Sequence, residues 1–229
     1  MSFADILRAV LQLVVILPAV ASHEVAHGYI AYRLGDPTAK SRGRLTLNPL
    51  AHVDPIGSIL VPLFLILVRS PYLFGWAKPV PVNPRYFRNP LKGMLYVAIA
   101  GPMTNLILAL VTAAAGRLIL LGIPDSLLFR SDSFTALVVQ VILFLLGAFV
   151  IINVVLAVFN LLPIPPLDGS RILTYFLPLA GRRAMLAMEQ YGFIILVAIL
   201  LLGGLSGLFN LTSGIWKGLL GIRWYNALG

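Results

Sequence analysis

Residues 134–162 read FTALVVQVILFLLGAFVIINVVLAVFNLL. This run lies inside a longer stretch, 133–167, that contains no acidic residue, no basic residue and no histidine. A helix needs about 20 mostly apolar residues to cross a bilayer, so the run predicts a membrane-spanning helix. Residues 93–116 form a second stretch without charge and predict another such helix.

The composition of the whole chain agrees with a membrane protein. Hydrophobic residues make up 59% of the 229 residues, charged residues only 11%, and the mean hydropathy is +0.96. A soluble domain carries about 25% charged residues, so a soluble globular protein is excluded. A disordered chain and a disulfide scaffold are excluded as well. Because cysteine is absent, thiolate metal sites and cysteine nucleophiles are also excluded.

Five runs are apolar enough to be considered as spans. They are 5–34, 93–120, 134–162, 187–203 and 205–220. We therefore expect an all-α polytopic membrane protein with about five to six transmembrane helices. The first run continues into His23 without a cleavage site of small residues, which favours a retained helix over a signal peptide.

The segment 35–92 has a different character because it contains nine prolines. Proline disfavours helix here, and 44–47 and 78–82 are typical of short extended pieces. The apolar run 56–68 has 13 residues, too few for a comfortable span. We expect a partly extended region with a re-entrant segment that enters the membrane and returns.

The distribution of basic residues predicts the orientation. The chain has a net charge of +9, and nine of its 17 basic residues lie in 33–92. The positive-inside rule places 33–92 and 163–185 in the cytoplasm, and 122–133 and the N-terminus outside. Basic residues that flank apolar runs are explained by orientation and by anionic lipid headgroups, so nucleic acid is not an expected partner.

The most informative motif is His23-Glu24-Val25-Ala26-His27. Residues i and i+4 share one face of a helix, so both imidazoles can reach one metal ion. Glu24 projects beside them, where it can take a proton from a water that the metal activates. The alternative is that these residues cap a helix or face a polar cavity, but polar groups beside an apolar run are expensive without a function.

Two histidines leave a catalytic zinc site one protein ligand short. Asp168 follows the long uncharged stretch and is one of only eight acidic residues, so it is a candidate third ligand. The alternative is that Asp168 caps a helix at 170–177, since Asp is a favoured N-cap residue.

These motifs together resemble the site-2 protease family of intramembrane zinc metalloproteases, peptidase family M50. The resemblance rests on His23-Glu24-x-x-His27, on Gly101-Pro102-x-x-Asn105, and on Asn160-x-x-Pro163-x-x-x-Leu167-Asp168-Gly169. It covers about residues 5–173 and is similar to the minimal prokaryotic type without a PDZ domain. It implies a single membrane-embedded metalloprotease domain over 1–229, with accessory helices at about 183–220.

The resemblance also implies the roles of individual residues. His23, His27 and Asp168 would bind one Zn²⁺ per chain, and Glu24 would be the general base. Asn105 and Asn160 would lie near the active site, whereas the ordinary explanation for such residues without the resemblance is interhelical hydrogen bonding. The implied reaction is regulated intramembrane proteolysis of transmembrane protein substrates, in a prokaryotic inner membrane, with the active site open towards the cytoplasm.

Two further features leave alternatives open. His52 is either a group on the substrate side of the site or a turn residue in a proline-rich connection. Residues 57–62 are either an extended edge for a substrate or a short packing helix. The rival function is a metal-handling membrane protein, a transporter or metal chaperone, that uses the same His and Asp cluster. Nothing in the sequence indicates an oligomeric state.

Overall fold

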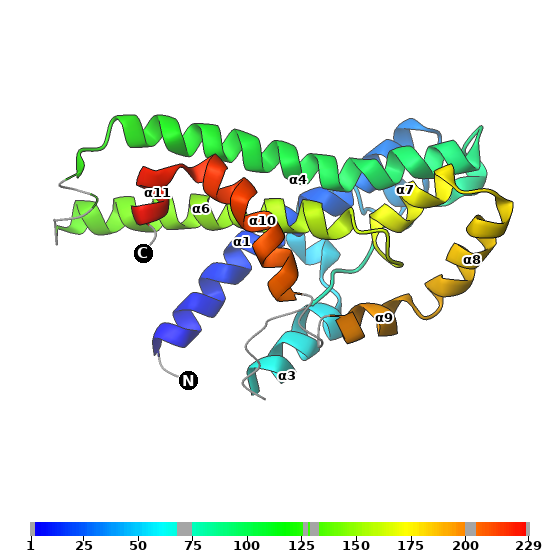
Figure 1. The fold of residues 1–229 in the computed structure, drawn as a ribbon, viewed down its shortest axis with the longest axis horizontal. Coiled ribbons are helices and arrows are strands. Elements are labelled where there is room, and N and C mark those ends of the chain that lie inside the picture. The colour runs from blue at the N-terminus through cyan, green and yellow to red at the C-terminus, as the bar shows by residue number, and fades with distance from the viewer. Residues whose placement is uncertain (1–2, 68–74, 126–127, 129–132, 200–204, 228–229) are drawn as a thin grey trace. The chain divides into compact units, whose positions relative to one another are not determined.

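The computed structural model describes residues 3–67, 75–125, 128, 133–199 and 205–227. Among these residues the regular structure is helical and no strand occurs, which confirms the expected all-α membrane fold. Three helices are long: α1 (Phe3–Arg33), α4 (Pro90–Leu121) and α6 (Phe134–Asn160) (Figure 1). They are the described helices with the length and hydropathy of membrane spans, α1 over Val14–Arg33.

The remaining helices are shorter. They are α2 (Thr38–Ser41), η1 (Pro49–His52), η2 (Pro55–Leu60), α3 (Val61–Leu67), η3 (Pro84–Tyr86), α7 (Asp168–Phe176), α8 (Leu179–Glu189), α9 (Gly192–Ile199), α10 (Leu205–Leu220) and α11 (Ile222–Ala227). The chain forms two compact units, which share the three long helices. The expected division into a core at 5–173 and accessory helices at 183–220 stays a prediction.

The first unit consists of Met1–Ala19, Asn105–Phe159 and Ser206–Gly229. Its core forms around Trp224 of α11, which is fully buried and packs with apolar residues of α4 and α6 such as Leu143. The indole N–H of Trp224 donates a hydrogen bond to Leu143 O at 3.1 Å. Gly116 of α4 lies so close to the indole that a Cβ there would collide with it.

The second unit consists of Val20–Thr104 and Asn160–Leu205. One small core joins its parts of α1 and α4 through Ala31, Phe87 and Val97. The unit also holds the proline-rich segment, where 44–48 and 75–83 have no regular structure. These two pieces are therefore non-helical as expected, although they form no strand.

Of the two alternatives for 57–62, the extended edge is wrong and the short helix is correct, because η2 and α3 make these residues helical. Asp54 accepts hydrogen bonds from Ile56 N and Gly57 N at 3.0 and 2.7 Å, and Pro55 occupies the first helical position. An Asp cap followed by Pro is a strong signal for a helix start. At this position the helix-start signal of Asp54 and Pro55 outweighs the tendency of proline to disfavour helix.

The helical segment Pro55–Leu67 is short and apolar. Residues 76–78, which follow it in the chain, form hydrogen bonds with residues at its start. Trp76 N donates to Gly57 O at 3.1 Å, and Lys78 N donates to His52 O at 2.8 Å. Thirteen residues of helix are too short to cross a bilayer. This return supports a segment that enters the membrane and leaves on the same side.

The expected span at 187–203 needs correction. Helix α8 ends at Glu189 and α9 begins at Gly192, so the two ends of the expected span do not belong to one described helix. Gly192 lies close to Pro165, where a Cβ would be 2.7 Å from the carbonyl oxygen. Residues 200–203 lie outside the described part of the chain. Helix α10 matches the expected 205–220, but 16 residues are fewer than the roughly 20 that a span needs.

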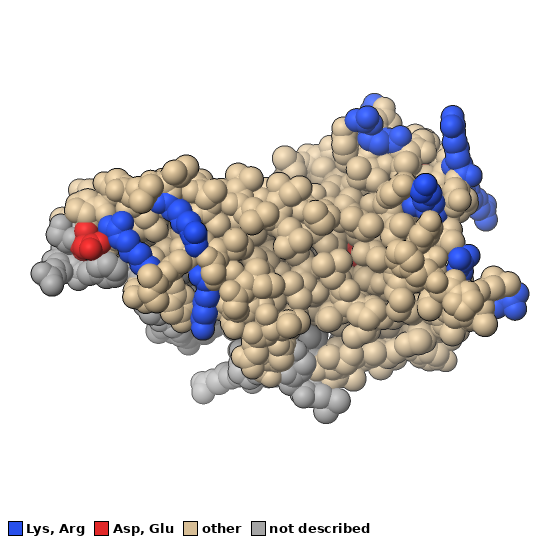
Figure 2. Space-filling model, turned by 45° about the horizontal axis from the view of Figure 1, so that its top comes forward, with Lys and Arg blue, Asp and Glu red and all other residues tan. Residues whose placement is uncertain are grey.

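Apolar side chains cover much of the protein surface. On the face drawn in Figure 2, Lys, Arg, Asp and Glu occupy only small areas. Large apolar residues of the long helices are exposed, for example Leu118 at 68% and Phe134 at 80%. Such a surface is stable in lipid, where no hydrophobic penalty attaches to its exposure.

Candidate metal centre

The two motif histidines lie on one face of α1, within the second unit. His23 and His27 are both buried, and their Nε2 atoms are 3.0 Å apart. One helical turn separates them, as the spacing of i and i+4 requires. The rings meet edge to face, with centroids 4.6 Å apart.

Asp168 joins these histidines from a distant part of the sequence. It is the first residue of α7, and its Oδ2 lies 3.2 Å from Nε2 of both His23 and His27. The N-cap position belongs to Leu167, so Asp168 does not occupy the capping position that the alternative assigned to it. Burial raises the pKa of Asp168, but the two adjacent imidazoles lower it to about 2. The side chain is therefore a carboxylate at neutral pH.

The three atoms form a triangle of the size that zinc requires. Its edges are 3.0, 3.2 and 3.2 Å. Tetrahedral zinc, bonded at about 2.0 to 2.1 Å, keeps its ligand atoms about 3.3 Å apart. Oδ2 of Asp168 is buried and has no hydrogen-bond partner of good geometry, as expected for a metal ligand. Among the described residues, no other His, Cys, Asp and Glu side chains form such a group of three.

The hydrogen bond on the far side of His27 also suits metal binding. Nδ1 of His27 lies 2.7 Å from Val97 O, to which it donates. In a neutral imidazole this bond holds the proton on Nδ1 and leaves the lone pair of Nε2 for a metal. The motif predicts the histidine, but nothing in the sequence pairs it with the carbonyl of Val97.

Gly101 lets the backbone of α4 approach the histidines closely. A Cβ at this position would lie 2.5 Å from Cε1 of His23 and 2.6 Å from Cε1 of His27. Sequence analysis used Gly101 only as part of a family motif and missed this role. The available signal was a glycine inside an apolar helix, where it costs stability relative to alanine unless close packing requires it.

Glu24 is fixed by the non-helical segment 75–83. Its Oε2 accepts a 2.7 Å hydrogen bond from Val80 N, and the side chain is half-buried. Arg44, 9% exposed, donates from Nη2 to Lys78 O at 2.7 Å and so also holds this segment. Neither Val80 nor Arg44 was found by sequence analysis, because both contacts join segments that are far apart in the chain.

The two asparagines lie in different units. Asn105, in the first unit, is fully buried and donates from Nδ2 to Asn153 Oδ1 at 2.7 Å and to Ala19 O at 3.3 Å. These bonds join α4 to α6 and α1, and Asn153 was missed by sequence analysis. Asn160, in the second unit with the histidines, is the half-buried last residue of α6.

His52 closes a turn in the proline-rich segment. It is 3% exposed at the end of η1, and its Nε2 donates to Thr46 O at 2.8 Å. Its backbone carbonyl accepts from Lys78 N. These contacts are those of a turn residue, and His52 is not part of the metal cluster among the described residues.

Comparisons with known proteins agree with this geometry. The model of peptidase family M50 matches residues 75–203, which include Asp168. YwhC of Bacillus subtilis, named as a zinc metalloprotease, is 43% identical over 184 residues, 77% of this chain and 74% of that protein. Rip2 of Mycolicibacterium smegmatis, also named as a zinc metalloprotease, is 33% identical over 193 residues. Rip2 of Mycobacterium tuberculosis, with the same name, is 31% identical over 193 residues. Each alignment covers 84% of this chain and 67% of the relative. No solved structure matches the chain.

Proposed function

Because the chain belongs to peptidase family M50, we propose that this zinc metalloprotease hydrolyses peptide bonds within or near transmembrane segments of membrane proteins. The observation that carries the proposal is the group of His23, His27 and Asp168, because its two histidines and Glu24 lie on α1, a helix apolar enough to span a membrane. A soluble protease has no need to place its ligands on such a helix.

In this proposal His23, His27 and Asp168 hold one zinc ion through Nε2, Nε2 and Oδ2. Zinc, when bound, activates water and polarises a peptide carbonyl as a Lewis acid. The carboxylate of Asp168 supplies negative charge to the site, and the bond from His27 Nδ1 to Val97 O orients that imidazole. Gly101 leaves the space in which both rings lie.

Glu24 is the general base and then the general acid. Val80 N–H holds Oε2, so we assign proton transfer to Oε1. This oxygen takes a proton from the attacking water and delivers it to the nitrogen of the leaving amine. The C–N bond breaks, and the products are a carboxylate and an amine.

The position of the site on α1 supports access from the cytoplasm. His27 lies six residues before Arg33, which corresponds to about 9 Å along a helix. Arg33 begins the basic region 33–92, which the positive-inside rule assigns to the cytoplasm. Water and an unwound substrate segment would then reach the site from that side of a prokaryotic inner membrane.

The rival function, a metal transporter or metal chaperone, has less support. Such a protein needs several polar sites along a path through the bilayer. The described residues offer one group of metal-binding side chains. Glu24 is also unnecessary for a site that only binds metal.

The decisive experiment uses the reconstituted full chain with a single-span model substrate. Glu24→Gln keeps the size of the side chain and removes the base, so cleavage should fall by at least about 100-fold while zinc stays bound. Glu189→Gln is the matched control, since Glu189 is exposed and contacts Arg171 only at 3.9 Å. Unchanged cleavage by Glu24→Gln would refute the mechanism, and cleavage confined to loops far from the membrane would refute the substrate class.

A further inference from the structure

Two adjoining hollows lie between the end of α1 and the start of α4, within the second unit. One has a volume of about 580 Å³, and the other has about 340 Å³. Arg33, Leu34 and Tyr96 line both, so the hollows adjoin. Neither hollow includes a residue of the metal cluster.

The larger hollow is basic. Arg33, Arg88 and Lys92 line it, and no acidic residue does. None of these three side chains forms an ion pair with a carboxylate in the described part of the chain. Asp36, the nearest acid in sequence to Arg33, is fully buried and already accepts hydrogen bonds from Thr38 and from Asn83 N. The positive charge of the hollow is therefore left for an external anion.

The start of α4 adds to this preference for an anion. Its first turn contains no acidic residue, and a helix N-terminus carries partial positive charge. Asn89 Oδ1 accepts from Lys92 N at 3.0 Å and so begins the helix beside the basic hollow. Tyr86 and Tyr96, 53% and 44% exposed, also line the hollow. Tyrosines are enriched where a membrane span meets water.

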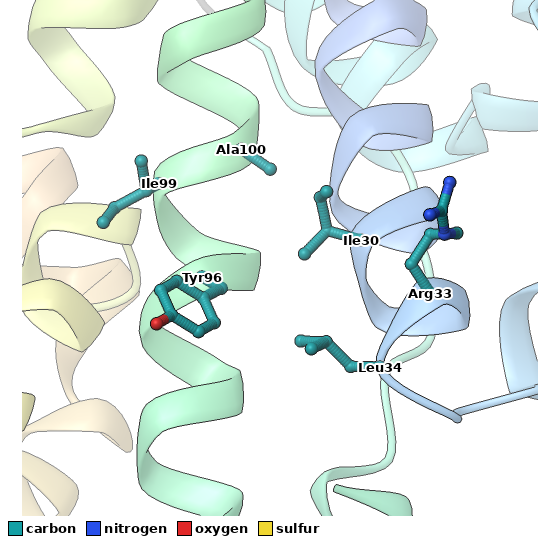
Figure 3. A pocket seen from close by; sticks show the side chains of 6 residues that line it. All are labelled: Ile30, Arg33, Leu34, Tyr96, Ile99 and Ala100. Atoms are coloured by element: carbon teal, nitrogen blue, oxygen red, sulfur yellow. The ribbon is translucent and has the colours of Figure 1, made fainter.

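The smaller hollow is apolar. Ile30 of α1 and Leu34, the residue after α1, point towards α4, as Figure 3 shows. Tyr96, Ile99 and Ala100 line the hollow from α4, and Arg33 is its remaining lining residue. Both helices are apolar enough to span the membrane, so we expect this hollow to face lipid, next to the basic one. The apolar lining of this hollow offers no favourable contact to a small soluble anion, whereas it suits an acyl chain.

We infer that the two hollows form a binding site for one phospholipid with a net-negative headgroup. Arg88 and Lys92 hold the phosphate, and an acyl chain lies between Ile30 and Ala100. A basic pocket between membrane helices that adjoins an apolar groove has the chemistry of an anionic-lipid site. Such a lipid would hold the end of α1 against the start of α4 close to the metal centre, because Ile30 lies about one helical turn after His27 and Ala100 directly precedes Gly101.

The site is tested on the purified full chain in detergent, titrated with phosphatidylglycerol or phosphatidylcholine and followed by native mass spectrometry. Phosphatidylglycerol should be retained more tightly. Arg88→Gln/Lys92→Gln should weaken its retention about 30-fold, the loss expected for two cations at a membrane surface. Arg42→Gln/Arg183→Gln removes the same charge at exposed positions outside the hollows and should leave retention unchanged. Equal retention of both lipids, or equal loss in both double variants, would overturn the inference.

A second arm separates a lipid from a soluble anion. Ala100→Phe fills the apolar hollow and should weaken retention of phosphatidylglycerol, while excess inorganic phosphate should not displace the lipid from the parent. Ile30→Phe fills the same hollow from α1 and replaces Ala100→Phe if that variant does not fold. Displacement by phosphate, together with unchanged retention in the folded Phe variant, would assign the basic hollow to a soluble anion and refute the lipid.

Discussion

The backbone N–H of Val80 donates a 2.7 Å hydrogen bond to Oε2 of Glu24, the residue between the two metal-site positions of α1. Val80 belongs to a segment without regular structure, so helix geometry does not hold it in place. Arg44 holds the segment in place instead, because its side chain donates a hydrogen bond to the carbonyl oxygen of Lys78, two residues before Val80. The buried guanidinium of Arg44 thus helps to position Glu24, the proposed base, through the backbone of residues 78–80.

Arg44→Ala should therefore reduce kcat about ten-fold while zinc remains bound, because segment 78–80 loses its anchor and Glu24 loses its fixed position. Turnover and zinc content are measured on one sample. Arg44→Lys should recover part of the rate, since Lys keeps a donor. Arg42→Ala removes an exposed neighbour and should have no effect. A fall in thermal stability without any change in kcat would leave Arg44 with a purely structural role.

Asp168→Ala should lower zinc affinity by at least about ten-fold, because it removes one of three proposed ligands and leaves the three long helices unchanged. Zinc retention is measured against a chelator of known affinity, with helix content followed by circular dichroism. The parent should hold about one zinc ion per chain. Glu189→Ala removes an exposed carboxylate as control. Parent-like zinc retention in Asp168→Ala would exclude this residue as a ligand.

Gly101→Ala tests the close approach of α4 to the histidines. The added Cβ would lie within 2.6 Å of atoms in both imidazoles, so the rings must move and zinc affinity should fall. Gly214→Ala is the matched control, because nothing lies within 4 Å of a Cβ there. That change, inside α10, should leave zinc bound and stabilise the helix by up to about 1 kcal/mol. If both variants bind zinc as the parent does, Gly101 does not determine the geometry of the site.

The pair Asn105 and Asn153 separates a structural role from a catalytic one. Asn105→Leu leaves the buried Oδ1 of Asn153 without its donor and should cost about 1 kcal/mol of stability. Asn105→Leu/Asn153→Leu removes both groups and should recover most of that loss. Unfolding in mild detergent and substrate turnover are both measured. A stable double variant with full turnover would show that the proposed active-site support by Asn105 is wrong.

Topology is tested with single cysteines in this cysteine-free chain. Arg42→Cys, Arg85→Cys and Arg183→Cys lie at exposed positions in the basic regions and should react with a membrane-impermeant reagent from the cytoplasmic side. Pro124→Cys should react from the opposite side. Labelling of positions 42 and 85 from opposite sides would mean that Pro55–Leu67 crosses the membrane. The zinc prediction does not depend on that result.

Residues 57–62 show where local patterns mislead. Many prolines surround this segment, and proline disfavours helix inside a run. At Pro55, however, proline follows the capping side chain of Asp54 and starts a helix instead. The break at Gln190 is similar, since 187–203 is apolar on average while Glu189 ends one helix and Gly192 begins the next. Average hydropathy finds apolar chain but not the places where helices start and stop.

The sequence by itself determined that this is an all-α membrane protein, that 93–120 and 134–162 are helices, and that His23 and His27 share one face. These features depend on hydropathy and on the period of the helix, which are local properties of the chain. Only the tertiary structure decided that Asp168 Oδ2 lies 3.2 Å from both imidazoles, that Gly101 leaves them room, and that Val80 N–H holds Glu24. Those relations join segments that are distant in sequence, and packing between helices, rather than any local pattern, brings them together.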